Sequence, residues 1–152
     1  MRSFEVLPGV PAWEGMTPAA RVVAAFLATV RVTGDAAPAR RLMADRVPCH
    51  QVVSEAPETV LRTPEDYAAH VREMLAELGP FRFHVTELLS EADHVYVRWR
   101  QAGQVRDTRD PLHGPTRAVD DVGSAVYRVR HGRIVEYWVQ LDRLGLAVQL
   151  DR

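Results

Sequence analysis

The chain has 152 residues, of which 47% are hydrophobic and 26% charged, and this composition suits one globular domain with a single core. Its 19 Lys and Arg residues face 20 Asp and Glu residues, and the net charge of −1 argues against nucleic-acid binding, which usually needs a basic excess. The only cysteine, Cys49, excludes an intramolecular disulfide and favours a reducing cytoplasm. Residues 1–20 lack the apolar core of a secretory signal, and no apolar run is long enough to span a membrane, so we expect a cytoplasmic protein without membrane contact.

The first half of the chain is predicted to be mainly helical. Residues 1 to about 16 contain several Pro and Gly residues, so we expect an extended arm before one domain that spans residues 17–152. Thr17-Pro18 and Thr63-Pro64 each have the pattern of an N-cap followed by proline in the first turn. With the apolar spacing that follows, three helices are expected, over residues 17 to about 34, 37–44 and 63–79.

The second half is predicted to form a sheet. Strands are expected at Val47–Val53, Phe81–Leu89, His94–Gln101, Arg117–Arg130 and Ile134–Asp142, whereas residues 54–62 are predicted to be a loop. Helices followed by a run of antiparallel strands predict an α+β fold. A curved sheet of about four to six strands, wrapped by about three helices, can enclose a pocket.

The last predicted strand has two different faces, because successive side chains of a strand point in opposite directions. One face would carry Ile134, Glu136, Trp138, Gln140 and Asp142, and the other Val135, Tyr137, Val139 and Leu141. A face that mixes polar and aromatic side chains is typical of a ligand pocket, so we expect the first set to line one. The apolar set suggests a homodimer interface, unless it packs under the helices.

This strand also belongs to a longer pattern. Residues 127–150, YRVRHGRIVEYWVQLDRLGLAVQL, fix a turn, an aromatic residue, an aspartate and a Gly-Leu pair in one register. The segment resembles the C-terminal signature of the SnoaL-like polyketide cyclases, which belong to the nuclear-transport-factor-2-like superfamily, and the resemblance extends more weakly from about Ala19 to the end. It implies a cone-shaped barrel with a deep pocket. It also implies a cofactor-independent cyclase or isomerase that acts on a polyketide-like or terpenoid intermediate, by aldol-type or epoxide-opening ring closure.

The resemblance assigns candidate catalytic residues. Asp142, in the W-x-x-x-D pattern, would be the general acid/base, and an apolar pocket would raise the pKa of its carboxyl toward neutrality. Its alternative roles are a cap for residues 144–146 or an ion pair with Arg143. His50 and Gln51 fall where the family places polar pocket residues, and His50 could relay protons. A hydrogen-bonded structural histidine is the alternative.

Further pocket residues are expected on the last two strands. Trp138 and Gln140 share the face of Asp142, and Gln140 could orient a substrate oxygen or be a core amide. Glu136 would lie about 20 Å from Asp142 along an extended strand, so the two carboxylates cannot form a close pair. Glu136 is therefore a functional acid or a charge at the rim. Tyr127 could donate a phenolic proton, or simply be a buried tyrosine.

Strand 94–101 offers two alternative linings for the pocket. If Tyr96 and Arg98 point inward, they would bind a substrate oxyanion, with Tyr96 as a further catalytic group. If Trp99 points inward instead, the pocket is flatter and more aromatic. Alternation alone does not choose between them, because curved sheets often contain bulges.

Two departures from the family pattern leave the reaction open. Ala125 stands where the family often has a polar residue, and Gly123 lies two positions before it. Limonene epoxide hydrolases carry an aspartate at the position of Gln140, so water activation is weakly supported. Epoxide hydrolysis therefore stays an alternative, as does a non-catalytic small-molecule-binding or dimerisation domain.

The sequence gives no pattern for a bound metal or nucleotide cofactor. The six histidines are scattered without metal-ligand spacing, and a Gly-rich phosphate loop is absent. The expected partners are a small hydrophobic substrate and a second copy of the chain.

Overall fold

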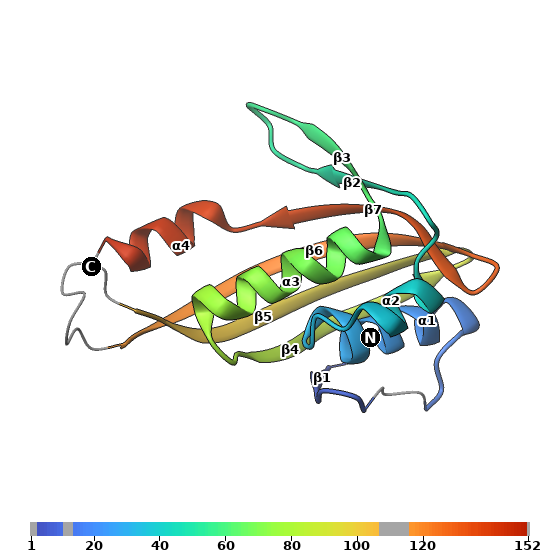
Figure 1. The fold of residues 1–152 in the computed structure, drawn as a ribbon, viewed down its shortest axis with the longest axis horizontal. Coiled ribbons are helices and arrows are strands. Elements are labelled where there is room, and N and C mark those ends of the chain that lie inside the picture. The colour runs from blue at the N-terminus through green and yellow to red at the C-terminus, as the bar shows by residue number, and fades with distance from the viewer. Residues whose placement is uncertain (1–2, 11–13, 107–115, 152) are drawn as a thin grey trace.

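The structure, a computed structural model, describes residues 3–10, 14–106 and 116–151 (Figure 1). These residues form, in order, β1 (Phe4–Val6), α1 (Pro18–Phe26), the π-helical segment η1 (Leu27–Arg31), α2 (Ala36–Leu42), β2 (Val47–Gln51), β3 (Glu58–Arg62), α3 (Pro64–Leu78), β4 (Arg82–Glu91), β5 (His94–Arg106), β6 (Thr116–Arg130), β7 (Arg133–Leu141) and α4 (Arg143–Leu150). The strands make one sheet in the order β1-β4-β5-β6-β7-β2-β3, in which β2 and β7 are parallel and the other neighbours antiparallel.

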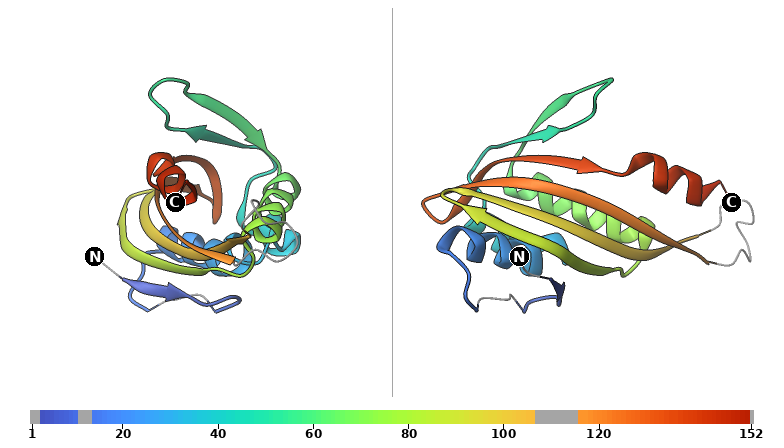
Figure 2. Two further views of the ribbon diagram at one scale, coloured as in Figure 1. Left: turned by 90° about the vertical axis from the view of Figure 1, so that its left-hand side faces the viewer. Right: turned by 180° about the vertical axis from the view of Figure 1, so that it is seen from behind.

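The sheet curves around the helices without closing into a barrel. Figure 2 shows β4 to β7 bending into a trough, with α1, α2 and α3 on its inner side. The β2–β3 hairpin leaves the sheet beside β7 and points away from it (Figures 1 and 2). The predicted α+β architecture is therefore confirmed, as an open cone of helices and a mostly antiparallel sheet.

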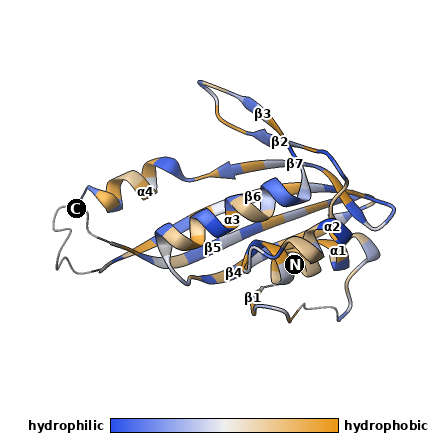
Figure 3. Ribbon diagram, viewed as in Figure 1, coloured by the Kyte–Doolittle hydropathy of each residue, from blue (hydrophilic) through white to orange (hydrophobic). Residues whose placement is uncertain are grey.

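Side-chain caps fix where the two longest helical stretches begin. The hydroxyl of Thr17 accepts a hydrogen bond from the backbone N–H of Ala20, at 3.2 Å. Thr63 and Asp66 form a capping box, in which each side chain accepts from the other residue's backbone N–H. Both predicted N-caps are therefore confirmed. Along α3, hydrophilic and hydrophobic residues alternate, as Figure 3 shows.

In the part of the chain that the structure describes, no helix is both long and apolar enough to cross a bilayer.

Three elements differ from the predictions, and one of them is the helix α4, which follows the last strand. Residues 58–62, within the expected loop, form β3, which pairs along its whole length with β2. Leu61 on this outermost strand is exposed, so β3 lacks the buried alternation that identifies a strand in a sequence. The expected arm contains β1, whose Val6 is buried and pairs with Phe83 of β4.

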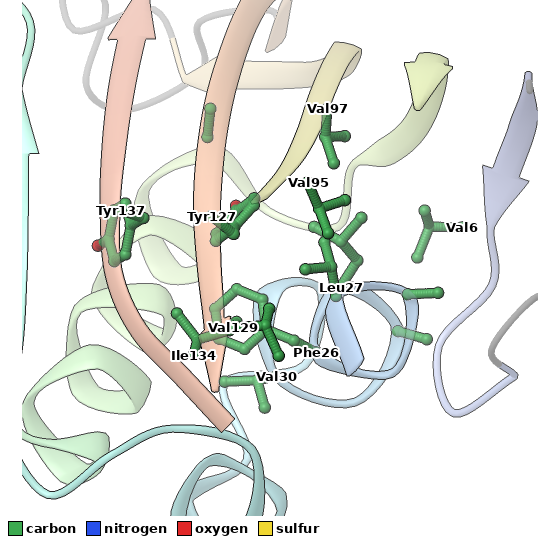
Figure 4. Close-up of a cluster of buried hydrophobic side chains, with 14 of the residues drawn as sticks. Val6, Phe26, Leu27, Val30, Val95, Val97, Tyr127, Val129, Ile134 and Tyr137 are labelled. Atoms are coloured by element: carbon green, nitrogen blue, oxygen red, sulfur yellow. The ribbon is translucent and has the colours of Figure 1, made fainter. Parts of the chain in front are cut away.

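The core lies between α1, η1 and the inner face of the sheet. Phe26 and Val30 are fully buried, and they pack with Val95, Tyr127 and Ile134 from three neighbouring strands (Figure 4). Burying large aliphatic and aromatic side chains of this kind contributes roughly 1.5–3 kcal/mol each. The helices are therefore held on one face of the sheet, and side chains on that face either fill the core or line a cavity.

A β-bulge in β7 decides which side chains point inward. The pairing with β6 shifts between Arg128 and Val129, so that Ile134 and Tyr137, three residues apart, both face the helices. Glu136, Trp138 and Gln140 consequently lie on the outer face. The prediction that Ile134 shares one face with Glu136, Trp138, Gln140 and Asp142 is therefore wrong, because the bulge breaks the alternation between Ile134 and Glu136.

The apolar set of β7 is likewise placed differently from the first expectation. Tyr137 is 6% exposed, and its ring lies 6.2 Å from that of Tyr67 on α3. Val139 packs against the core. These side chains are under the helices, which was the alternative to a dimer interface.

Candidate active site

An aromatic cavity of about 120 Å³ lies between α3 and the inner face of the sheet. Its walls include Tyr67, Trp99, Tyr127 and Tyr137, and the ring centroids of the last two tyrosines are 5.5 Å apart. Burial raises the pKa of Tyr67 to about 12 and also raises the pKa of Tyr127 and of Tyr137. These phenols therefore stay protonated near neutral pH, so each can donate a hydrogen bond to a substrate oxygen.

One face of α3 supplies the opposite wall. Tyr67, His70, Val71 and Met74 recur at intervals of three and four residues, which places them on the same side of the helix. His70 stands at the rim, exposed on one side. Partial burial lowers the pKa of its imidazole, and the nearby charges of Arg62 and Arg31 lower it further. The neutral ring that results can accept a proton at neutral pH.

Two arginines reach the same cavity from different elements. Arg31 is the last residue of η1, and Arg62 is the last residue of β3. An Nη2–H of Arg31 donates to Oε1 of Gln101 at 2.9 Å, and its guanidinium lies over the rings of Phe83 and Trp99, 5.1 and 6.0 Å from their centroids. π-helical segments often occur at functional sites, and η1 is what directs Arg31 at the sheet.

A carboxylate, that of Asp121, lies next to the cavity on the inner face of β6, two residues before Gly123, which pairs with the cavity residue Trp99. Asp121 pairs with buried Gln101 across β5 and β6 and shares the inner face with Gly123. Burial raises the pKa of Asp121, although Arg31 and the backbone N–H of Val122 oppose the shift. Among the described residues, Oδ1 of Asp121 and Nη1 of Arg31 are buried side-chain atoms without a hydrogen-bond partner.

A larger groove opens where the hairpin separates from β7. It has a volume of about 590 Å³, and its lining includes His50, Trp138, Gln140 and Arg143. Gln51 and Leu141 line both this groove and the aromatic cavity. The two hollows therefore adjoin at these side chains, and we expect a substrate to pass from the groove into the cavity there.

A hydrogen-bonded cluster forms the outer-face wall of the groove. The rings of His50 and Trp138 are stacked with centroids 5.1 Å apart, and Nε2 of His50 lies 2.7 Å from Oε2 of Glu136. Glu136 also accepts from Arg128 at 3.0 Å, and His50 and then Arg128 lower the pKa of this carboxyl. Nδ1 of His50 is 2.8 Å from the hydroxyl of Thr59. His50 is thus held by partners on both ring nitrogens.

Asp142 occupies neither the cavity nor the groove. Its exposed carboxylate accepts a hydrogen bond from the backbone N–H of Gly145, at 2.9 Å, and so caps α4. Arg143, the other suggested partner, pairs with Glu55 instead. The expected water-poor surroundings of Asp142 are therefore wrong, and the capping alternative describes its geometry. It does line a separate open hollow of about 320 Å³, together with Arg98 and Gln140.

The two linings considered for β5 are also separated. Trp99 is 3% exposed and lines the cavity, whereas Arg98 lies on the outer face and pairs with Glu87 at 3.1 Å. Tyr96 shares the outer face and lines none of these hollows. Of the predicted site residues, the structure brings Tyr127, Trp99 and Gln51 together in the cavity.

The match to known families covers most of the chain. A model of the family "SnoaL-like polyketide cyclase" matches residues 21–150. The chain belongs to this family. No curated protein matches this SnoaL-like chain.

Solved structures with the same SnoaL-like fold cover nearly the whole chain. A candidate polyketide cyclase from Acidithiobacillus ferrooxidans is 19% identical, with a TM-score of 0.72 over 91% of this chain and 98% of that one. IdmH, a candidate polyketide cyclase from Streptomyces antibioticus, is 22% identical, with a TM-score of 0.72 over 88% and 99%. TsrD from Streptomyces laurentii is 18% identical, with a TM-score of 0.67 over 88% and 94%. At these identities, the likeness shows the shared fold.

Several groups of this SnoaL-like site were not singled out from the sequence. Arg31 follows an apolar helical stripe, His70 looks like a polar residue on an amphipathic helix, and Arg62 lies in the expected loop. Only the spacing of Tyr67, His70 and Val71 gave a usable signal, because it predicts one helix face. Among the described residues, no three His, Cys, Asp or Glu side chains are placed to hold a metal ion.

Proposed function

We propose that this SnoaL-like protein is a cofactor-independent cyclase or isomerase of a polyketide-like or terpenoid intermediate, working by general acid/base catalysis in the aromatic cavity. The observation that carries the proposal is the meeting of a base and a cation in one hollow: His70, with a lowered pKa, and the guanidinium of Arg31 line the same cavity. A positioned base contributes roughly 10²–10⁴-fold to a proton transfer.

An aldol-type closure would proceed in two proton transfers. His70 removes a proton from the carbon next to a substrate carbonyl, and Arg31 and the cavity phenols stabilise the enolate oxygen. The enolate carbon attacks a second carbonyl of the folded substrate, which forms the ring bond, and the new alkoxide takes the proton back from the imidazolium. In an epoxide opening, neutral His70 would instead take the proton of a substrate hydroxyl while its oxygen attacks an epoxide carbon, which forms the ring bond and breaks the epoxide carbon–oxygen bond. The resulting alkoxide, stabilised by Arg31, then takes the proton from the imidazolium.

In this proposal, Asp121 is a positioning residue for Arg31. Its carboxylate attracts the guanidinium through charge, and its backbone pairs across the strands with Gln101, whose side chain accepts the hydrogen bond of Arg31. The catalytic role predicted for Asp142 stays a prediction, and the same set of variants tests it.

The test combines ring-forming probes with four variants. β-Dicarbonyl and epoxide probes would be followed by exchange of the α-proton in D₂O and by mass spectrometry of the products. His70→Gln should lower the rates of α-proton exchange and of ring formation by about 100-fold or more, without changing the unfolding midpoint. The control is His84→Gln, which changes a histidine that is hydrogen-bonded to Ser3 and should leave both rates unchanged. Full activity of His70→Gln would refute the assignment.

The remaining two variants separate the carboxylates. Asp142→Asn should keep turnover because asparagine also caps helices, whereas Asp121→Asn should lower the turnover rate more than it changes the KM. Loss of turnover in Asp142→Asn alone would restore the role that the family resemblance implies for Asp142.

One observation favours the non-catalytic alternative. The cavity volume of about 120 Å³ is below the roughly 300–1,000 Å³ of typical ligand pockets, so a cyclase substrate must also occupy the groove. Probes that bind without exchange or ring formation would favour a small-molecule-binding domain, and epoxide hydrolysis without ring closure would favour the hydrolase alternative. The homodimer also stays a prediction.

A further inference from the structure

We infer that the substrate of the aromatic cavity carries a carboxylate, which Arg62 and Arg31 bind while the aromatic walls hold its ring. This inference rests on the proposed function, because it assumes that the cavity receives the substrate. The first observation is the charge of the lining. Arg31, Arg62 and His70 line the cavity, and none of its described lining residues is Asp or Glu.

The charge of Arg31 lacks an ion-pair partner within the described residues. Its nitrogens lie more than 4.0 Å from every described carboxylate oxygen, and its one hydrogen bond there is to the neutral amide of Gln101. Nη1 is buried without a partner. Asp121 interacts with Arg31 at longer range. A half-buried guanidinium without a paired anion is costly, and an incoming anion relieves that cost.

Arg62 repeats the pattern from β3. It is half-buried at the end of β3, and no carboxylate of the described residues forms an ion pair with it. The contrast with nearby arginines is informative. Arg128 and Arg143, beside the groove, each pair with a glutamate, at 3.0 and 2.6 Å. Exposed arginines such as Arg21, Arg41 and Arg46 also lack an ion pair among the described residues, but water solvates them, whereas Arg31 and Arg62 are half-buried and line the cavity.

A carboxylate on a ring suits both the charge and the size of this site. Guanidinium groups bind carboxylates through paired N–H donors, and these bonds are strong where water is excluded. A dry cavity of about 150 Å³ holds a benzene ring, so the volume of about 120 Å³ accommodates about one ring, and a second fused ring would extend toward Gln51 and Leu141. The rest of a longer substrate would pass Gln51 and Leu141 into the groove.

The test uses two probes of one shape and different charge, 2-naphthoate and 2-naphthamide. Their dissociation constants would be measured by calorimetry, and their location by amide chemical shifts of Val71 and Met74. The wild-type protein should bind naphthoate about tenfold more tightly or better, as hydrogen bonds to charged groups imply. Arg62→Gln should bring the two constants close together, and Arg62→Lys, which keeps the charge, should retain most of the difference.

The control is Arg41→Gln, which changes an exposed arginine of α2 and should preserve the preference for naphthoate. Equal affinity of the wild-type protein for both probes would overturn the inference. So would an unchanged preference in Arg62→Gln, or shifts that avoid Val71 and Met74. Should Arg62→Gln not fold, the wild-type ratio and its decrease with added salt still decide the question.

Failure of this inference is distinguishable from failure of the proposed function. Ring closure of an acid and of its methyl ester at equal rates would leave the cyclase standing and remove the carboxylate preference. If the protein bound naphthoate tightly in the cavity but converted none of the ring-forming probes, the carboxylate preference would stand and the proposed cyclase function would fall.

Discussion

At the scale of single residues, Gly123 determines how far the indole of Trp99 reaches across the sheet. A Cβ atom at this position would lie 2.6 Å from Cζ2 of Trp99 and 2.8 Å from Cδ2 of Leu141. Both neighbours line the cavity. Because Gly123 has no side chain, Trp99 and Leu141 can pack directly against the β6 backbone beside the cavity.

Gly123→Ala should therefore disturb the cavity. The methyl group pushes Trp99 and Leu141 from their places, and overpacking of this kind costs about 1–3 kcal/mol. We expect a lower urea midpoint and weaker binding of 2-naphthoate. Ala125→Gly, on the same inner face, should cost stability without moving Trp99, so equal loss of binding in both variants would contradict this reasoning.

The Glu136 cluster predicts a pH dependence of stability. His50 and Arg128 hold the pKa of the folded carboxyl below its usual 4.5, so its contribution is present above about pH 4.5 and is lost as the pH falls through the lowered value. The difference in urea midpoint between wild type and Glu136→Gln should therefore be largest near neutrality and shrink toward about pH 3. Glu58→Gln, at the exposed start of β3, is the control. A difference that grows on acidification would contradict the sign.

At the scale of elements, the separation of the hairpin from β7 opens a groove next to the cavity, and we expect this groove to be the entrance. β2 pairs with β7 only from Cys49 to Gln51, and beyond that point the two strands diverge. The groove occupies the divergence, and Leu141, 43% exposed, stands between groove and cavity. An ion pair at 2.6 Å between Glu55 and Arg143 joins the hairpin tip to α4 beside this opening.

Leu141→Trp should consequently obstruct the junction. We expect slower association of 2-naphthoate, and little change in the folding midpoint, because the side chain is partly in solvent. Relaxation-dispersion NMR of the bound probe measures the exchange rate. Leu89→Trp, at a comparably exposed leucine of β4, should leave the rate unchanged. An unaltered rate in Leu141→Trp would place the entrance elsewhere.

Local chemistry explains which elements were predictable. The Thr17 and Thr63 caps depend on neighbours three residues away, and the turn at His131-Gly132, with φ of 51° and 73°, is set by its own residues. The site depended on longer-range facts. The inward position of Tyr137 rests on a bulge that two strands make together, and β3 is a strand only because β2 is beside it. Trp99, Tyr127 and Gln51 could be predicted as site residues from their residue type and their position on strands, because that prediction did not depend on knowing which face of the strand points inward.

At the scale of the whole molecule, one edge of the sheet is covered by a short N-terminal strand. β1 pairs with β4 over Phe4, Glu5 and Val6, and Glu5 is bridged to Arg82 at 3.0 Å. Without β1, the backbone N–H and C=O groups of β4 would face solvent, and exposed edges promote association between chains.

Removal of residues 1–7 should therefore lower stability and increase aggregation. The loss of the buried Val6 side chain contributes roughly 1.5–3 kcal/mol. Unfolding midpoints and light scattering on warming measure the two effects. Glu5→Gln keeps the strand and removes only an exposed ion pair, so it should resemble the wild type. A truncated chain as stable and as monodisperse as the full one would show that β4 needs no cover.

The bulge in β7 has an evolutionary consequence. Val135 is the extra residue of the bulge, because Ile134 and Glu136 pair with adjacent residues of β6. If the bulge were lost with Val135 kept in the ladder, the pairing would slip by one residue, which would turn Trp138 and Gln140 toward the interior and send Tyr137 and Val139 outward. A change at the bulge alone would thus give the cavity a different set of functional groups while the scaffold stayed the same. Such domains can therefore change their chemistry by gain or loss of a bulge as well as by point substitution.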